Sequence, residues 1–262
     1  MNLPMTRARV SALVLAGCML VAVAAPGVAQ TNAPLTVLAS VAVKGAFEQL
    51  GPLFEKTAAR RVVMQYDSGA AITRRVAAGE AFDVVITSAA GVDDFVKTGA
   101  VAADAHAIVG TAVASLAYKD GMPKPDISTP EALRAVVLGA KTISFSDPAA
   151  GGASSVYFAG VLDRLGIADA IKQKATLTKP GDGAGPVGSG QAEIGVAQSS
   201  EIALVPGVDG VPIFPSDPKS KSIYAAGVSS KSTQPDAARA FLRFLLSPDG
   251  AAIRKAKGLG AG

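Results

Sequence analysis

The chain has 262 residues, a formal net charge of +4, 5% aromatic residues and no tryptophan. Its acidic and basic residues are interspersed, and so weak a balance excludes a dedicated nucleic-acid or membrane-surface binder. The few aromatic rings argue against a stacking platform for bases or sugars. One cysteine and one histidine exclude thiolate and multi-histidine metal sites, so neither a metal nor a cofactor is predicted.

The first 29 residues are typical of a secretory signal peptide. Arg7 and Arg9 precede the apolar run Val10–Ala25, and small residues follow it. The run has about 16 residues, which is shorter than the roughly 20 that a membrane-spanning helix needs. We predict cleavage after residue 29 or 30 and export to the periplasm. As an alternative, Leu15–Cys18 fits a lipobox, in which Cys18 would be lipidated.

Removal of this leader leaves 233 residues, enough for two modest lobes or one large domain. The leader holds two arginines and no acidic residue, so the net charge falls from +4 to +2. It also holds the only cysteine, so a mature chain has no disulfide and tolerates an oxidising compartment.

Strand and helix patterns alternate in the first part of the mature chain. Apolar, β-branched runs predict strands, and apolar residues three and four apart predict helices. The predicted order is strand 35–39, helix 43–54, strand 61–66, helix 70–78 and strand 82–86. Pro52 is expected to bend or shorten the first helix. This alternation is typical of a parallel sheet covered by helices.

The second part continues the alternation and contains an internal similarity. The segment Gly79–Ile86 resembles Gly190–Val196, since each has Gly-x-Ala, an acidic residue and an apolar strand. Two similar α/β halves would place their helix N-termini at a shared cleft. The predicted elements are strands at 111–118, 142–145, 175–177 and 194–196, and helices at 130–138, 154–165, 235–246 and after Ser247.

Three turns join a strand end to a helix start through small residues: Ser40–Val43, Asp67–Ala71 and Gly151–Ser155. A helix start presents unpaired N–H groups and the positive end of the helix dipole, and small side chains let a ligand reach them. Such a turn binds an anion without a full countercharge. The alternative is that the serines only cap their helices. Three turns in register with two halves favour the anion site.

Candidates for charge pairing and catalysis are few. Lys44 follows the first turn closely and is the candidate charge partner of an anion, although a lone charge usually lies on a solvated face. Residues 183–188 fit G-x-G-x-x-G, but Pro186 lies inside the motif and no long helix follows. His106 is interpreted as a surface residue. No catalytic residue is predicted.

Six segments, read in chain order, carry a resemblance to a known family. They are Leu35–Ser40, Tyr66–Ala70, Gly79–Ser88, Ser146–Pro148, Gly190–Val196 and Phe241–Gly250. In this order they resemble the molybdate-type periplasmic binding proteins of ATP-driven (ABC) importers. The resemblance spans nearly the whole mature chain and implies a type II periplasmic-binding fold, an α/β fold with two lobes, each a mostly parallel sheet flanked by helices. It further implies a first lobe of residues 30–113 plus 224–262, a second lobe of 114–223, and hinge crossings near 111–118 and 222–228.

The resemblance implies a ligand site more firmly than it implies the ligand. Family members that hold molybdate use two serines and a tyrosine, and these positions fall here on Ala42, Gly69 and Gln198. Because three side-chain donors are replaced or displaced, a small organic di- or tricarboxylate is favoured over a molybdate-like oxyanion. The predicted ligand-binding residues are Ser40, Ala42, Lys44, Ser68, Gly69, Ala153, Ser154 and Gln198.

We therefore expect a monomeric periplasmic receptor that captures a small anion for an ABC permease in the inner membrane, without catalysis and without a nucleic-acid partner. Two alternatives stay open. One is a sensor that passes ligand occupancy to a signalling partner. The other is an exported enzyme on the same scaffold, which would need an acid–base pair or a nucleophile in the cleft.

Overall fold

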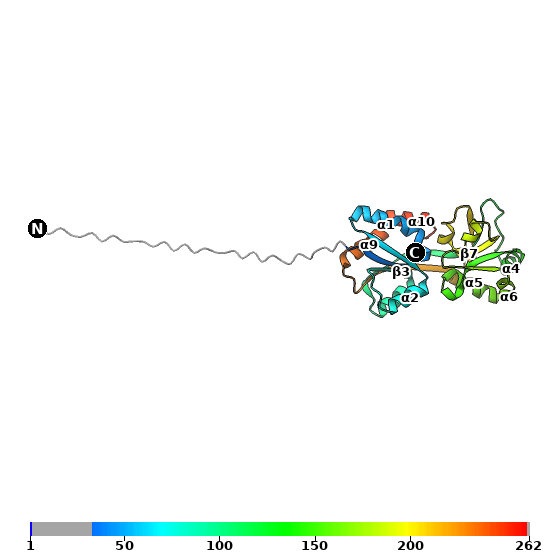
Figure 1. The fold of residues 1–262 in the computed structure, drawn as a ribbon, viewed down its shortest axis with the longest axis horizontal. Helices are drawn as coiled ribbons and strands as arrows, with labels where there is room; N and C mark the ends of the chain where they lie inside the picture. Colours follow the sequence, from blue (N-terminus) through cyan, green and yellow to red (C-terminus); the bar gives the residue numbers. More distant parts are fainter. Residues whose placement is uncertain (2–32, 261–262) are drawn as a thin grey trace. The chain divides into compact units, whose positions relative to one another are not determined.

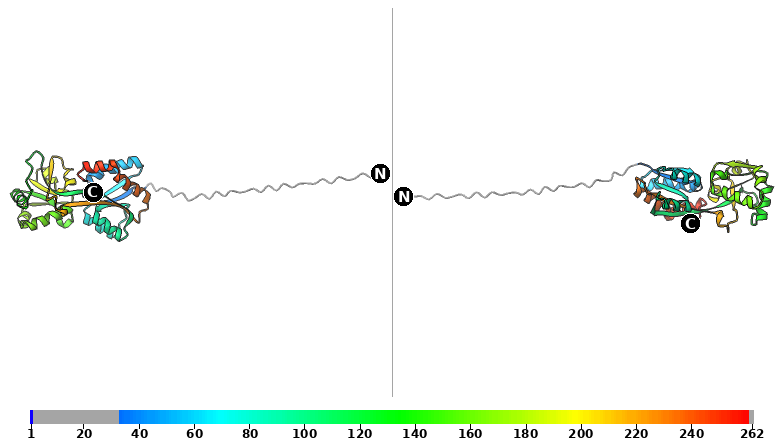
Figure 2. Two further views of the ribbon diagram at one scale, coloured as in Figure 1. Left: turned by 180° about the vertical axis from the view of Figure 1, so that it is seen from behind. Right: turned by 90° about the horizontal axis from the view of Figure 1, so that it is seen from below.

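The computed structural model describes residues 33–260 together with Met1. Apart from Met1, the predicted signal peptide and Cys18 lie outside the described residues. Residues 33–260 form two lobes, each a sheet with helices on both faces, and long strands run from one lobe into the other (Figures 1 and 2). Within this range, every helix is too short or too polar to cross a membrane.

The first lobe has a sheet in the order β2-β1-β3-β9. Its first three strands are parallel, and β9 runs antiparallel to β3. The strands are β1 (Leu35–Ser40), β2 (Val62–Asp67), β3 (Val84–Ser88) and β9 (Lys221–Ser229). The helices are α1 (Lys44–Ala58), α2 (Gly69–Ala77), α3 (Ala89–Lys97), α9 (Pro235–Leu246) and α10 (Pro248–Ala256), with the 3-10 turn η1 (Val41–Val43) between β1 and α1.

Successive residues of β1 contribute to two separate cores of the first lobe. Val37 packs in the core that includes Phe47 of α1 and Phe241 of α9. Its neighbour Leu38 packs in the core that includes Ile72 of α2. Because successive side chains of a strand point to opposite faces, this sheet is buried on both faces. That burial explains why its strands read as nearly continuous apolar runs.

The second lobe has a sheet in the order β4-β7-β5-β6, and β8 also pairs with β4. Its core includes Phe145 of β5 and Phe158 of α5, whose ring centroids lie 5.4 Å apart. The strands are β4 (Val101–Lys119), β5 (Ile143–Ser146), β6 (Ala175–Thr178), β7 (Ile194–Gln198) and β8 (Val208–Pro212). The helices are α4 (Pro130–Gly139), α5 (Ala153–Arg164), α6 (Ala168–Lys172), α7 (Gly185–Gly188) and α8 (Ser199–Ile202), with the 3-10 turns η2 (Pro148–Ala150) and η3 (Pro218–Ser220).

The two lobes share a pair of antiparallel strands, β4 and β9. Their pairing runs from Val101↔Ser229 to Val113↔Lys221, and the residues of β4 from Ala114 onward pair with β7 and β8 instead. Outward from this pair, each sheet continues with an antiparallel strand (β3 or β7) and then two strands parallel to that one. The two similar segments found in the sequence therefore occupy equivalent places, because they form β3 and β7. The predicted hinge segments fall on β4 and β9, and their movement stays a prediction.

Several elements differ from the sequence-based expectation. The strand predicted at 111–118 is the second part of β4, which begins at Val101 because β9 pairs with it along most of that length. Helix α1 continues past Pro52 to Ala58, since the proline is exposed while Leu50 and Phe54 on either side are buried in the core. The elements α3, α6, α7, α8 and β8 were not predicted. Four of these are only four or five residues long and carry too little periodicity.

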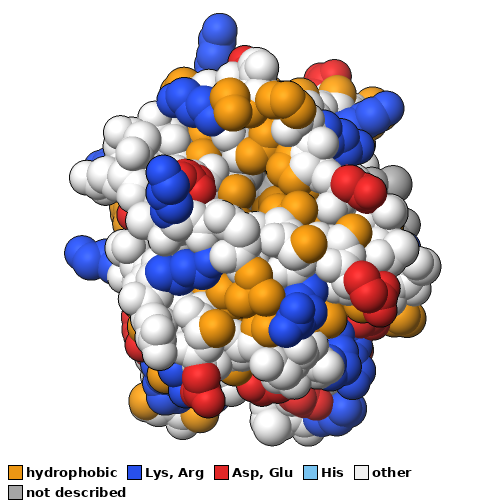
Figure 3. Space-filling model, turned by 90° about the vertical axis from the view of Figure 1, so that its right-hand side faces the viewer, with side chains coloured by type: hydrophobic (Ala, Val, Ile, Leu, Met, Phe, Trp, Pro, Cys, Tyr) orange, Lys and Arg blue, Asp and Glu red, His pale blue; other side chains and the backbone are white. Residues whose placement is uncertain are grey.

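Figure 3 shows the outer end of the second lobe. Lysine, arginine, aspartate and glutamate side chains surround a group of hydrophobic side chains on this face. Charges of both signs occur there, which agrees with the interspersed charges of the sequence. This face therefore lacks the single-sign field that a nucleic-acid surface would show.

Candidate functional site

A cavity of about 540 Å³ lies where strand ends and helix starts of both lobes meet. The first lobe contributes the turns that follow β1, β2 and β3. The second lobe contributes the start of α5, the loop at Gly181 and the end of β7, and β9 closes one side. The wall consists of residues 40–42, 68–70, 73, 87–90, 146, 151–154, 181, 198, 201 and 221–224.

Serine side chains cap the helix starts of the first lobe. The hydroxyl of Ser40 accepts from the N–H of Ala42 at 3.4 Å, and the hydroxyl of Ser68 accepts from the N–H of Ala71 at 3.2 Å. Ser88 does the same for α3 at 3.2 Å. These serines are therefore helix caps, as the alternative reading of the sequence held. All three also line the cavity. The hydroxyls of Ser68 and Ser88 keep their own hydrogens to donate to a ligand, whereas the Ser40 hydroxyl also forms a hydrogen bond with Tyr224.

The helix start in the second lobe is built differently. Helix α5 follows Gly152, which has no side chain to cap it, and the Ser155 hydroxyl donates to the Gly152 carbonyl at 2.9 Å. The first N–H groups of a helix have no acceptor within the helix. Ala153 and Ser154 therefore present main-chain donors at the cavity wall, where the positive end of the helix dipole adds to them.

The turn before α5 comes close to the first lobe. Gly151 has φ +76, and a β-carbon built on it would overlap the β-carbon of Ala70 at the start of α2. Gly181, with φ +86, similarly lies against Val41 of η1. The hydroxyl of Ser200 donates to the carbonyl of Ala42 at 2.6 Å. The lobes thus touch on more than one side of the cavity.

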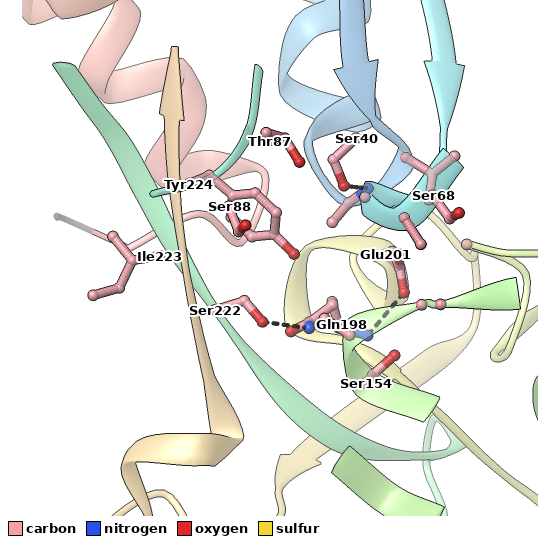
Figure 4. A pocket seen from close by; sticks show the side chains of 18 of the residues that line it. Ser40, Ser68, Thr87, Ser88, Ser154, Gln198, Glu201, Ser222, Ile223 and Tyr224 are labelled. Atoms are coloured by element: carbon pink, nitrogen blue, oxygen red, sulfur yellow. Dashed lines mark hydrogen bonds between the residues drawn. The ribbon is translucent and has the colours of Figure 1, made fainter. Parts of the chain in front are cut away.

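The end of β7 contributes an amide side chain to the wall. Gln198 is 2% exposed, and its Nε2 donates to the hydroxyl of Ser222 on β9 at 2.9 Å (Figure 4). Its Oε1 is buried and has no hydrogen-bond partner among the described residues. A buried acceptor of this kind is costly unless it is satisfied, so a ligand or water is expected beside it.

Two ionisable groups of the wall are strongly perturbed by burial. Glu201 on α8 is 7% exposed, and its Oε2 accepts from the N–H of Gln198 at 2.9 Å. Burial raises the pKa of Glu201 to about 7, although that hydrogen bond acts in the opposite direction. Burial also raises the pKa of the Tyr224 hydroxyl above its ordinary range, and the charge of Glu201 raises it further. The cleft therefore holds a carboxyl group that changes its protonation near neutral pH.

Lys221 is the only cationic residue among those that line the cavity. It begins β9 and is exposed, whereas Glu201 is the only acidic group of the wall and is buried. The wall therefore offers many neutral donors and little net charge. No group of three or more His, Cys, Asp or Glu side chains able to hold a metal ion occurs within residues 33–260.

Seven of the eight predicted ligand-binding residues lie in the cavity wall. They are Ser40, Ala42, Ser68, Gly69, Ala153, Ser154 and Gln198. The structure does not bring Lys44 to the wall. Its ammonium group lies 3.5 Å from the carboxylate of Glu48, and 6.0 Å from the ring centroid of Tyr66 on β2. The turn η1 intervenes between β1 and α1, so that Val41 and Ala42 meet the cavity and Lys44 points elsewhere. His106 is exposed on β4, as its surface interpretation required.

Sequence reasoning missed several residues of the wall. Thr87 and Ser88 lie in a segment that carried the family resemblance, and their place at the end of a predicted strand was the available signal. Lys221 and Tyr224 lie at or beside the predicted crossing near 222–228, which gave no sign of facing a ligand. Glu201 follows β7 by only three residues, in a helix too short to predict.

These features define a class of protein. Residues 35–260 match the family of bacterial extracellular solute-binding proteins, and the chain belongs to that family. Its two-lobed α/β architecture is the periplasmic-binding-protein fold of receptors that serve ABC importers.

Individual relatives differ in what they bind or do. An aconitate isomerase from Pseudomonas sp is 32% identical over 237 residues, which cover 88% of this chain and 89% of that protein. The periplasmic molybdate-binding protein of Azotobacter vinelandii has a TM-score of 0.70 at 18% identity, covering 87% of this chain and 99% of its own. A sulfate-binding protein from Mycobacterium tuberculosis has a TM-score of 0.63 at 20% identity, covering 86% of each chain. The two solved structures share the fold with this chain.

Proposed function

We propose that this protein is an exported receptor that captures a small polycarboxylate, of the tricarboxylate class, and delivers it as a monomer to an ABC permease. The observation that carries the proposal is the cavity wall, in which hydroxyls of one lobe and helix-start amides of the other line one cavity that also has one cation in its wall. Neutral donors of this kind hold carboxylate oxygens by charge-assisted hydrogen bonds. The leader sequence supports the periplasm as the place of action.

Three observations favour a polycarboxylate over a tetrahedral oxyanion. The cavity of about 540 Å³ has room for a ligand much larger than molybdate or sulfate. The positions that hold molybdate in the resembling proteins are Ala42, Gly69 and Gln198 here, so those side-chain donors are changed. The 32% identical relative is named for aconitate, a tricarboxylate.

Titration calorimetry on the protein isolated after export tests this proposal. The ligands are trans-aconitate, cis-aconitate, citrate and tricarballylate, with molybdate and sulfate as the oxyanion arm. We expect at least one tricarboxylate to bind with a stoichiometry of one and to raise the thermal midpoint in a dose-dependent way. If molybdate or sulfate binds and no tricarboxylate does, the ligand is an oxyanion and the proposed ligand class is wrong.

A second candidate function is isomerisation of the same ligand. Two observations favour it: the relative named aconitate isomerase, and a cleft carboxyl, Glu201, whose pKa of about 7 suits proton transfer near neutral pH. Nuclear magnetic resonance of cis-aconitate incubated with the protein discriminates the two. A receptor leaves the cis isomer unchanged, whereas an isomerase produces trans-aconitate at a rate that falls sharply in Glu201→Gln.

A further inference from the structure

The cleft contains an acidic side chain, Glu201, which accepts from the N–H of Gln198 at the start of α8 but whose charge a site for anions does not require. Glu201 lies in a wall otherwise built from neutral groups and one cation, and it is 7% exposed. An ionised carboxylate there would repel a carboxylate ligand at short range, in surroundings that screen charge poorly. The site therefore needs either a proton on Glu201 or a hydrogen-bond donor on the ligand.

The two oxygens of the Glu201 carboxyl have different surroundings. Oε2 already accepts the hydrogen bond from the N–H of Gln198 at 2.9 Å. Oε1 lies on the side of Gly181. A β-carbon built on that glycine would be 3.8 Å from Oε1. The wall beside Oε1 therefore consists of the glycine backbone and the apolar side chain of Val41. Figure 4 shows the carboxyl between Gln198 and the first-lobe turn that carries Ser40. Oε1 is the oxygen that a bound ligand can reach.

Few charged groups surround Glu201. From β9 come Tyr224, whose pKa its charge helps to raise, and the exposed Lys221. The loop at Gly181 carries Asp182, but that carboxylate turns toward Gly185. The first lobe faces the cavity with uncharged residues, and no basic side chain within residues 33–260 forms an ion pair with Glu201. Among the described residues, only the hydrogen bond from the N–H of Gln198 favours an ionised Glu201, and burial outweighs it.

We propose that Glu201 binds the ligand as a neutral carboxylic acid, donating a hydrogen bond from Oε1 to a ligand carboxylate, so that any molecule in which Glu201 is ionised must take up a proton to bind. The inference rests on the proposed function, because it requires a carboxylate ligand. It makes Glu201 a ligand-binding residue and couples affinity to pH.

The protonation behaviour of Glu201 agrees with this geometry. Burial raises its pKa to about 7, so the acid is about half protonated at neutral pH. A bound anion raises the pKa further, because it disfavours the ionised form. The ligand therefore draws the missing proton from solvent, and affinity falls as pH rises above 7.

Titration calorimetry with trans-aconitate tests the proton directly. We expect Kd to rise about 15-fold between pH 7 and 8.5, because the carboxyl is mostly ionised at the higher pH and must be protonated before it can donate. At pH 8.5, heats measured in buffers of different ionisation enthalpy should show close to one proton taken up per ligand. If the protein binds at pH 6 but its Kd does not change with pH and no proton is taken up, the inference is wrong and the proposed function still stands. Absence of binding by any tricarboxylate at pH 6 overturns the proposed function.

Two variants separate a neutral donor from an ionised acceptor. Glu201→Gln keeps a donor and an acceptor in the same shape without a titrating proton, so its affinity should not change between pH 6 and pH 8.5, whereas that of the wild type falls. The matched control is Glu193→Gln, an exposed glutamate whose Oε2 accepts from the N–H of Lys141 at 2.8 Å away from the cavity. The control should keep the wild-type pH profile. If Glu201→Gln also keeps that profile, or if citrate binds to an ionised Glu201 through its hydroxyl without proton uptake, the inference is wrong.

Discussion

The two lobes reach the same cavity with equivalent strands but different chemistry. In the first lobe, Ser40, Ser68 and Ser88 each cap a helix start with a hydroxyl. In the second lobe, α5 follows Gly152 and has no side-chain cap. The first lobe therefore presents side-chain donors whose positions are fixed by the caps, and the second presents main-chain donors that only a substitution by proline would delete. An internal similarity of sequence thus predicts shared topology better than shared chemistry.

The largest effect should come from breaking the second lobe's contribution with Ser154→Asp. An acidic residue is favourable in the first turn of a helix, so α5 should stay folded. The new carboxylate would face the ligand, and repulsion of about 4 kcal/mol at a separation near 4 Å weakens Kd by at least about 100-fold. Titration calorimetry with trans-aconitate measures this loss.

The control for that change is Ser247→Asp. Ser247 caps α10, its hydroxyl accepts from the N–H of Gly250 at 3.2 Å, and it does not line the cavity. The same substitution at this helix start should leave Kd unchanged. Wild-type affinity in Ser154→Asp would show that the start of α5 does not face the ligand.

The second expected effect concerns stability and the buried acid of the second lobe. The pKa of Glu201 is raised from 4.5 to about 7 on folding, so the folded protein binds more protons than the unfolded chain between these values. The free energy of unfolding therefore falls as pH rises through this window, and above pH 7 it is lower by about 3 kcal/mol. Glu201→Gln should be more stable than the wild type at pH 8 by an amount of this order, and the advantage should shrink toward zero near pH 4.5.

Urea denaturation of both proteins across this pH range measures the difference. The difference is the informative quantity, because carboxylates with lowered pKa values, such as Asp104 and Asp217, act with the opposite sign in both proteins. If the free energies of unfolding of variant and wild type differ by a constant amount from pH 4.5 to 8, the pKa of Glu201 is not raised on folding.

A smaller effect is expected at the place where the lobes touch. Gly151→Ala adds a β-carbon that overlaps Ala70 and also strains a backbone at φ +76. Gly121→Ala strains a backbone at φ +80 but meets nothing within 4 Å. Both should lose about 1 kcal/mol of stability through the strained φ. Only Gly151→Ala should also weaken binding, by about tenfold, since the lobes must part. Equal affinities in the two variants would mean that this contact is not needed for binding.

The smallest effect distinguishes the two lysines near the cleft. Lys221 lines the cavity but is exposed, so Lys221→Met should weaken Kd by about two- to fivefold, the range of an exposed ion pair. Lys44→Met should leave Kd unchanged, because Lys44 lies outside the wall and pairs with Glu48. Calorimetry at low and physiological salt checks both. If Lys44→Met weakens binding more than Lys221→Met does, Lys44 is the charge partner of the ligand.

The sequence allowed the fold and most of the wall to be predicted, for identifiable reasons. The central strands β1, β3, β5 and β7 are buried and therefore appear as apolar runs, and serines or glycines occur in the turns after the strands. Lys44 was misplaced because η1 adds a turn that the spacing did not indicate. Glu201 and Lys221 were missed because one lies in a four-residue helix and the other at the start of a crossing strand. Their roles depend on contacts between distant segments, which periodicity does not encode.

The position of β9 has a consequence for how the chain is assembled. This strand lies between β3 and β4 in the middle of the structure, yet it spans Lys221–Ser229, near the C-terminal end. The N-terminal segment therefore cannot complete its own sheet while the ribosome is still translating the second lobe. Residues synthesised first must wait for those synthesised last, and the loop between them closes at a high entropic cost. A chain truncated before β9 is expected to lack both a finished first lobe and a cleft.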